Sequence, residues 1–122
     1  MSEAQRAVEA YFAAWNEKDP ARISALVKSC IAADAQLTSS AHSVTGADAL
    51  AEFIVAFRQM RPGDAAVLTS KVESVGAVFR FTGCGKQPDG TVYSDVMDVG
   101  ELDADGRIKR LVTFDSVMPS SS

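Results

Sequence analysis

The chain contains few residues that could hold a metal ion or form a disulfide. It has one histidine, His42, and two cysteines, Cys30 and Cys84, among 122 residues. The cysteines lie far apart in sequence among apolar neighbours, as buried, reduced thiols usually do. One histidine and two separated cysteines do not make a zinc-type cluster. We therefore expect no bound metal and no other cofactor.

Basic clusters and long apolar runs are also missing. The net charge is −4, which disfavours binding to nucleic acid or to an anionic membrane. The apolar stretches are far too short to span a bilayer, and the polar start MSEAQRAVEA is not a signal peptide. We expect a cytoplasmic protein that binds neither nucleic acid nor membrane.

Length and composition indicate one domain. A chain of 122 residues with 47% hydrophobic and 23% charged residues can bury one core and resembles ordinary globular proteins. No internal repeat or linker divides it. We expect a single domain over residues 1–118 and a disordered tail over residues 119–122, because the last residues are typical of a frayed terminus.

Apolar spacing predicts three helices in the first half of the chain. The first follows a capping box formed by Ser2 and Gln5. The second begins at Asp19 and Pro20, a helix-capping aspartate followed by proline in the first turn. The third runs over residues 46–60 and ends at an Arg-Pro-Gly-Asp turn. The expected apolar stripes are Val8, Tyr11, Phe12 and Trp15; then Ile23, Leu26, Val27 and Cys30; then Leu50, Phe53, Ile54 and Phe57.

Period-two alternation predicts strands in the second half. One short strand, over residues 35–38, is expected between the second and third helices. The later strands are expected over residues 66–74, 78–84, 91–102 and 107–117. Helices followed by consecutive hairpins indicate an α+β fold. We expect a cone-shaped barrel in which three N-terminal helices pack on a curved, mainly antiparallel sheet and leave an open cavity.

The closing hairpin carries two unusual acids. Asp98 and Asp115 each stand where a half-buried strand should be apolar, and a buried carboxylate is costly unless it is paired, neutralised or used. Parity places Gly100 beside Asp98, where it would leave room for a ligand, and Leu111 and Thr113 beside Asp115. The reverse parity, with Asp98 in solvent, remains open. If both acids reach one cavity, their repulsion separates the two pKa values and provides an acid and a base.

Four segments, in this order and spacing, resemble the nuclear-transport-factor-2-like superfamily, in its SnoaL-like and ketosteroid-isomerase-like branch. They are VEAYFAAWNEKDPARISALV, AADAQL, TGADALAEFIVAFR and DVGELDADGRIKRLVTFD. The resemblance covers nearly the whole chain and implies the cone-shaped fold. It does not imply one activity, because this fold hosts isomerases, cyclases, epoxide hydrolases, dehydratases and non-catalytic binders.

The resemblance implies roles for three residues. Tyr11 resembles the tyrosine with which ketosteroid isomerases donate a hydrogen bond to an enolate oxygen. Asp98 matches their protonated oxyanion-hole aspartic acid. Asp115 looks like the last-strand aspartate that serves SnoaL-type polyketide cyclases as acid or base. A packed core tyrosine and a solvent-exposed strand-end acid are the structural alternatives for Tyr11 and Asp115.

The chain also departs from its relatives. Ketosteroid isomerases carry their general base five residues after the position of Asp34, where this chain has Ser39, so we expect no authentic steroid isomerase activity. Epoxide hydrolases of the superfamily use an Asp-Arg-Asp set, which Arg80 followed by Thr82 does not reproduce. We expect Arg80 on the outer sheet face, paired with Asp95 or Glu101.

The expected ligand is a small apolar or aromatic molecule. Trp15, Phe53 and Phe57 would form an apolar wall. His42 is either an acid or base at the rim of the cavity or an exposed loop residue. The other residues expected to contact the substrate are Ser39, Phe81, Leu111 and Thr113.

These residues predict a small cofactor-independent enzyme that catalyses proton transfer, by isomerisation or aldol-type cyclisation, on an apolar carbonyl compound. Asp115 would be the general base, while Tyr11 and protonated Asp98 would stabilise the enolate oxygen. A non-catalytic small-molecule binder, and an epoxide hydrolase or dehydratase using the Asp pair, are the alternatives.

The outer face of the predicted sheet is too apolar for water. It carries Tyr93, Met97, Val99, Val112 and Phe114. An exposed apolar face of this kind usually marks an interface. We expect a homodimer formed through the outer sheet face, with the same patch on both subunits.

Overall fold

A computed structural model describes residues 1–115 of the chain. The predicted tail over residues 119–122, and the end predicted for the last strand at residues 116–117, lie outside the described residues. The helices are α1 (Glu3–Asn16), α2 (Pro20–Cys30) and α3 (Ala47–Met60). The strands are β1 (Ile31–Ser39), β2 (Ser43–Thr45), β3 (Ala65–Leu68), β4 (Glu73–Val75), β5 (Val78–Lys86), β6 (Val92–Leu102) and β7 (Ile108–Asp115).

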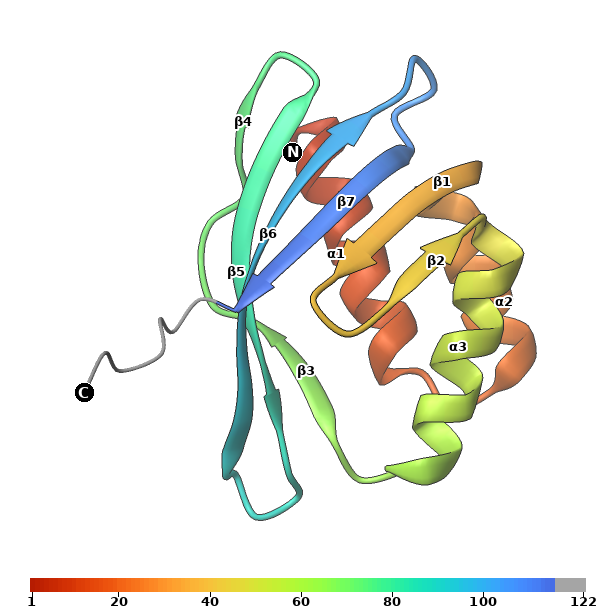
Figure 1. Ribbon diagram of the computed structural model, residues 1–122, viewed down its shortest axis with the longest axis vertical. Helices are drawn as coiled ribbons and strands as arrows, with labels where there is room; N and C mark the ends of the chain where they lie inside the picture. Colours follow the sequence, from red (N-terminus) through yellow and green to blue (C-terminus); the bar gives the residue numbers. More distant parts are fainter. Residues whose placement is uncertain (116–122) are drawn as a thin grey trace.

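The helices cover one face of a curved sheet, and the predicted α+β fold is confirmed (Figure 1). The strand order is β2-β1-β7-β6-β5-β3, with β4 also paired to β5. The pairing is antiparallel except between β1 and β7, which run parallel. The sheet is therefore mixed, and it curves around the helices without closing into a barrel.

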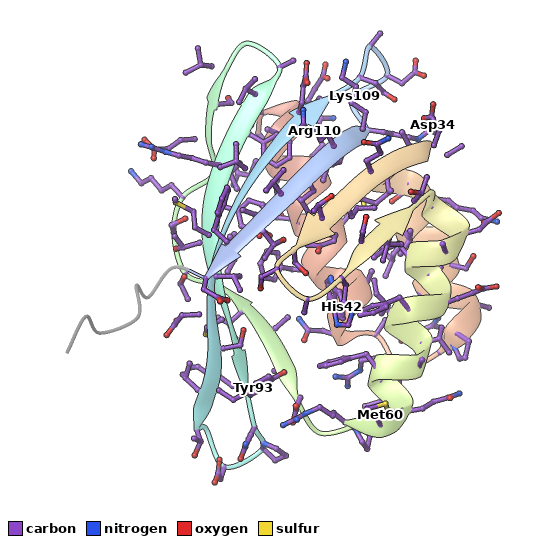
Figure 2. All side chains as sticks on the ribbon, viewed as in Figure 1. Asp34, His42, Met60, Tyr93, Lys109 and Arg110 are labelled. Atoms are coloured by element: carbon purple, nitrogen blue, oxygen red, sulfur yellow. The ribbon has the colours of Figure 1, made fainter. Side chains whose placement is uncertain are left out.

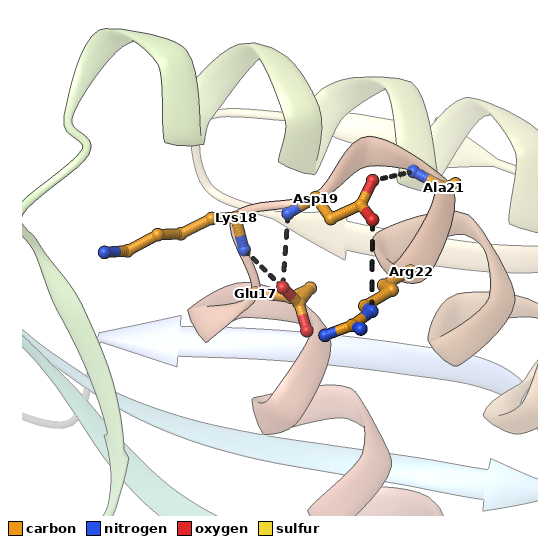
Figure 3. A network of polar contacts seen from close by, with 5 residues as sticks. All are labelled: Glu17, Lys18, Asp19, Ala21 and Arg22. Carbon is orange, nitrogen blue, oxygen red and sulfur yellow. Dashed lines mark hydrogen bonds and ion pairs between the residues drawn. The ribbon is translucent and has the colours of Figure 1, made fainter.

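Side chains at the helix starts determine where the helices begin. Ser2 Oγ accepts a hydrogen bond from the Gln5 amide and caps α1, as predicted. Figure 3 shows the turn into α2, where Asp19 accepts from the Ala21 amide and Glu17 accepts from two backbone amides. Each cap satisfies N–H groups that have no partner within the helix.

Apolar residues from all three helices and from the sheet form one core. Its largest fully buried members include Phe79, Phe81, Ile23, Ile54 and Leu111. Cys30 and Cys84 are buried free thiols, as predicted, and burial raises the pKa of Cys30 to about 12. Burial of the stripes predicted from helical spacing is the main source of stability for such short helices.

The end of α1 is fastened to the sheet edge by one side chain. Asn16 donates a hydrogen bond to the Ala66 carbonyl and accepts one from the Ala66 amide, both at 2.8 Å. The side-chain amide of Asn16 thus pairs with β3 much as the backbone of a neighbouring strand would. This contact holds α1 beside β3 on the side of the fold where the cavity opens.

The register of β6 settles the parity that the sequence left open. Asp98, Gly100 and Leu102 are buried on the inner face, while Asp95 is exposed. The prediction that Gly100 leaves room for a ligand was wrong. A Cβ at Gly100 would lie 2.9 Å from the Arg110 carbonyl oxygen and closer still to the Phe79 ring. Phe79 fills the space beside Gly100, so that glycine serves core packing.

The outer sheet face carries a different set of contacts. Arg80 lies there, as predicted, but its Nε donates to Glu73 on β4 at 3.0 Å. The prediction of Asp95 or Glu101 as its partner was wrong, because β4 pairs with β5 and brings Glu73 opposite Arg80. Glu101 pairs instead with Lys109 at 3.5 Å. Within residues 1–115, no helix has the length and apolar content needed to cross a bilayer.

Candidate active site

A cavity of about 320 Å³ lies between α1, α3 and the concave face of the sheet. Its walls are mostly apolar, and its volume is at the lower end of the range for small-molecule sites. Nine of the eleven residues predicted for the site line it: Tyr11, Trp15, Ser39, His42, Phe53, Phe57, Asp98, Leu111 and Thr113. The fold therefore gathers residues from α1, β1, α3, β6 and β7 around one space.

Asp98 is a buried acid on the sheet side of this cavity. Its side chain is only 3% exposed, and Oδ1 has no hydrogen-bond partner among the described residues. Burial raises the pKa of Asp98 to about 6, and the Thr113 hydroxyl, opposite on β7, counteracts that rise only in part. An unpaired buried carboxyl costs free energy, and strongly perturbed acids of this kind cluster at functional sites.

Tyr11 faces the same acid from α1. It is buried, and its pKa is raised first by burial and second by the nearby charge of Asp98. The Tyr11 and Trp15 rings meet edge to face, with their centroids 6.2 Å apart. The raised pKa keeps the Tyr11 hydroxyl protonated, so it can donate a hydrogen bond to a ligand oxygen.

An aromatic wall covers the helical side of the cavity. Trp15 packs edge to face on Phe57 at 5.3 Å and on Phe53 at 6.1 Å. The His42 ring packs on Phe53 at 5.0 Å. Such walls suit a flat apolar ligand.

Ser39 is occupied in shaping the turn between β1 and β2. Its Oγ accepts hydrogen bonds from the Ala41 and His42 amides and lies 3.3 Å from the His42 carbonyl oxygen. The turn places His42, which is exposed, at the rim of the cavity (Figure 2). Ser39 therefore positions His42 by holding the turn and has no base of its own.

The similarity of this chain to known proteins identifies its family. Residues 8–111 match the SnoaL-like domain. The chain belongs to the SnoaL-like family. A search of the curated proteins gives no match.

A solved structure supports the SnoaL-like assignment over the full chain. It is a "putative isomerase of the SnoaL-like family" from Agrobacterium tumefaciens str. C58, 31% identical, with a TM-score of 0.87 over 96% of this chain and 100% of that protein. The resemblance inferred from the four sequence segments is thereby confirmed.

Two more distant structures share the SnoaL-like fold alone. A "putative polyketide cyclase" from Sinorhizobium meliloti is 19% identical, with a TM-score of 0.68 over 88% of this chain and 92% of that one. A protein with a ketosteroid isomerase-like fold from Catenulispora acidiphila DSM 44928, in complex with trimethylamine, is 17% identical, with a TM-score of 0.70 over 91% of this chain and 85% of that one.

Two predicted site residues of this SnoaL-like domain lie outside the cavity lining. Asp115 is exposed at the end of β7, opposite Val96 and two residues beyond Thr113. It shares a strand face with Thr113, and Val96 opposite it lines the cavity, but the exposed Asp115 side chain is not itself part of the lining. Phe81 is buried beneath Phe12, with ring centroids 5.5 Å apart, and belongs to the core. The structure therefore does not bring Asp98 and Asp115 together.

The mouth of the SnoaL-like cavity holds charged residues that the sequence did not single out. Arg58 and Asp64 line the cavity although each is only 7% exposed. Arg58 continues the buried stripe of α3 four residues after Ile54. That spacing was the available signal, since an arginine on a buried helix face needs partners.

Tyr93 also lies at this mouth and not on the outer face, where it was predicted. Gly85 pairs with Ser94 and Lys86 with Val92, so Tyr93 is the extra residue of a β-bulge. Its ring crosses Gly85, where an added Cβ would lie 2.7 Å from Tyr93 Cζ. A bulge re-aims the side chain that it carries, and period-two counting fails at that residue.

Proposed function

We propose that this SnoaL-like protein is a small enzyme that moves a proton within an apolar carbonyl compound bound in the cavity. The observation that carries the proposal is Asp98, a buried carboxyl with an unpaired Oδ1 inside an apolar cavity. The relative from Agrobacterium, named as a "putative isomerase", supports the reaction class.

Asp98 is the general base in this proposal, in place of Asp115. With a pKa of about 6, the carboxyl is mostly ionised at neutral pH, which suits a base better than the hydrogen-bond donor predicted from the sequence. A base whose pKa is close to the working pH is the most effective proton carrier. Asp115 is exposed and is not among the residues that line the cavity, so Asp98 is the better placed of the two acids.

The proposed reaction uses two side chains. The Tyr11 hydroxyl donates a hydrogen bond to the substrate carbonyl oxygen, and Asp98 Oδ1 removes a proton from the adjacent carbon. The electron pair of the broken C–H bond forms an enolate, whose oxygen Tyr11 stabilises. In an isomerisation, Asp98 then returns the proton to another carbon. In a cyclisation, the enolate carbon attacks a second carbonyl, and Asp98 protonates the new alkoxide.

Solvent exchange tests this proposal without knowledge of the natural substrate. The probe is 2-tetralone, an apolar bicyclic ketone with acidic protons beside its carbonyl, incubated with the protein in D₂O and followed by proton NMR. We expect deuterium to enter at that carbon faster than in buffer with a protein lacking the cavity. An exchange rate equal to that of the buffer would favour the non-catalytic binder, because Asp98 is the one predicted acid that lines the cavity.

The Asp-pair alternatives receive no support from the geometry. An epoxide hydrolase or dehydratase of the predicted kind needs two acids in one cavity, and Asp115 lies outside it. Arg80, the other candidate, is exposed on the outer face and paired with Glu73. Proton transfer by a single acid is therefore the reaction that we propose.

We also propose that the protein forms a homodimer through the outer sheet face. Met97 pairs with Phe114 and Val99 with Val112 across the sheet, and Phe114 is 52% exposed. Light scattering at tens of micromolar should give the mass of a dimer. The change Phe114→Lys should give a monomer, whereas Met60→Lys, at an exposed position on α3, should not. A monomeric wild-type protein would contradict the proposal.

A further inference from the structure

The mouth cluster, formed by Arg58, Arg61, Asp64 and Tyr93, joins the end of α3 to β3 and β6. Its polar contacts connect all four residues, and Arg58, Asp64 and Tyr93 line the cavity. Figure 2 shows Tyr93 and Met60, the last residue of α3, toward the same end of the fold as His42. The cluster thus stands where a ligand would enter or project.

Arg58 carries a buried charge without a carboxylate partner. Its guanidinium donates to the backbone carbonyls of Asp64 and Pro62, the latter at 2.8 Å. Its Nε has no hydrogen-bond partner, and within residues 1–115 no carboxylate lies within salt-bridge distance of it. A guanidinium has five N–H donors, and a buried cation paired only with neutral carbonyls is incompletely compensated.

Asp64 does not compensate Arg58, because Arg61 uses its carboxylate. Arg61 Nε donates to Asp64 Oδ2 in an ion pair, and burial together with the nearby charge of Asp64 raises the pKa of Tyr93. The Arg61 guanidinium is held over the Tyr93 ring, 4.5 Å from its centroid. Two arginines and one aspartate leave the mouth cluster with one excess positive charge.

We propose that the cavity binds substrates whose apolar body ends in a carboxylate, and that Arg58 pairs with this carboxylate at the mouth. The inference rests on the proposed function, because it takes the cavity to be the substrate site. Tyr93 precedes Asp98 by five residues on β6, a separation of roughly 16 Å at a rise of about 3.2–3.4 Å per residue. The carboxylate is therefore far from the reacting carbon, and it orients the apolar body between Arg58 and Asp98.

A matched pair of probes tests this binding preference. They are 2-naphthylacetate and its neutral amide, 2-naphthylacetamide, which share the apolar body and differ in charge. By calorimetry or tryptophan fluorescence, we expect the wild-type protein to bind the carboxylate at least about tenfold more tightly, the change that one modest ion pair produces. Arg58→Met should remove the preference, by weakening binding of the carboxylate more than binding of the amide. Arg80→Met, on the outer face, should keep the preference.

Because Arg58 also holds the loop after α3, a second measurement uses the wild-type protein alone and does not depend on the folding of Arg58→Met. In ¹⁵N NMR spectra, the Arg58 Nε–H resonance should shift on addition of 2-naphthylacetate and not of the amide. Equal affinity for the two probes, binding of neither, or a preference that survives in Arg58→Met would overturn the proposal.

The same experiments separate this inference from the proposed function. Asp98→Asn should keep the preference for the carboxylate, because Arg58 is intact. A protein that prefers the carboxylate but does not exchange protons is a binder with this subsite. A protein that exchanges protons with no preference retains the proposed function and loses the inference.

Discussion

Replacing Asp98 with asparagine is expected to lower the enzymatic rate of deuterium exchange into 2-tetralone by roughly 10²–10⁴-fold, the contribution of a positioned general base. Asparagine has nearly the same shape and keeps the fold of β6, but its amide cannot take a proton. The comparison is made at equal protein concentration near neutral pH, where Asp98, with a pKa of about 6, is mostly ionised.

Two further acids on the closing hairpin provide matched controls. Asp95→Asn changes an exposed acid three residues before Asp98, and Asp115→Asn changes the exposed acid that the sequence predicted as the base. Both variants should exchange at close to the wild-type rate. Loss of exchange in Asp115→Asn, with exchange kept in Asp98→Asn, would return the base to Asp115 and contradict the assignment made from the cavity.

The stability of the protein is expected to depend on pH through Asp98. Burial raises the pKa of Asp98 from its ordinary value of 3.8 to about 6, so the folded state holds this proton more tightly than the unfolded state. The stabilisation is present below about pH 3.8 and is lost as the pH rises through about 6. At 1.36 kcal/mol per pKa unit, the full change is about 3 kcal/mol, most of it between about pH 4 and about pH 7.

The contribution of Asp98 to stability is measured as the difference between the wild-type protein and Asp98→Asn, because other carboxylates titrate in the same pH range. The free energies of unfolding of the wild-type protein and of Asp98→Asn are measured by chemical denaturation. From about pH 4 to about pH 7, the wild type should lose about 2 kcal/mol of stability relative to the variant. The variant Asp95→Asn should follow the wild type. A difference that stays constant with pH would mean that burial does not perturb Asp98.

The sequence predicted the fold and nine of the residues that line the cavity for simple physical reasons. Helical spacing located the buried stripes of α1, α2 and α3, and caps such as Ser2 and Asp19 located two helix starts. Period-two alternation put Asp98 and Gly100 on one face of β6 and left open which face, and the structure shows that this face is the inner one. These signals are local, and the elements that they describe are long and regular.

The positions of Asp115, Tyr93 and Arg58 depend on three-dimensional geometry that the spacing of residues in the sequence does not show. Asp115 has the predicted strand parity, yet parity cannot tell how far along β7 the cavity extends. Tyr93 turns toward the cavity because a bulge interrupts the alternation. Arg58 becomes part of the site only because the loop after α3 folds back and offers its carbonyls.

Within a SnoaL-like domain, these differences change the assignment of chemistry. The first-strand position at which ketosteroid isomerases carry a base holds Ser39, and its hydroxyl shapes the turn to His42. The last-strand acid lies outside the cavity. Asp98 is left as the buried acid with an unpaired Oδ1 that faces Tyr11, and the proposed proton transfer depends on that carboxyl.

Direct titration of the Asp98 carboxyl tests this dependence most closely. In the protein labelled with ¹³C at aspartate carboxyl carbons, the resonance absent from Asp98→Asn is that of Asp98, and its shift is followed with pH. The account predicts a midpoint near 6, well above the ordinary aspartate value. A midpoint at or below about 3.9, the value of an aspartate in water, would show a solvated or paired carboxylate and would contradict the account.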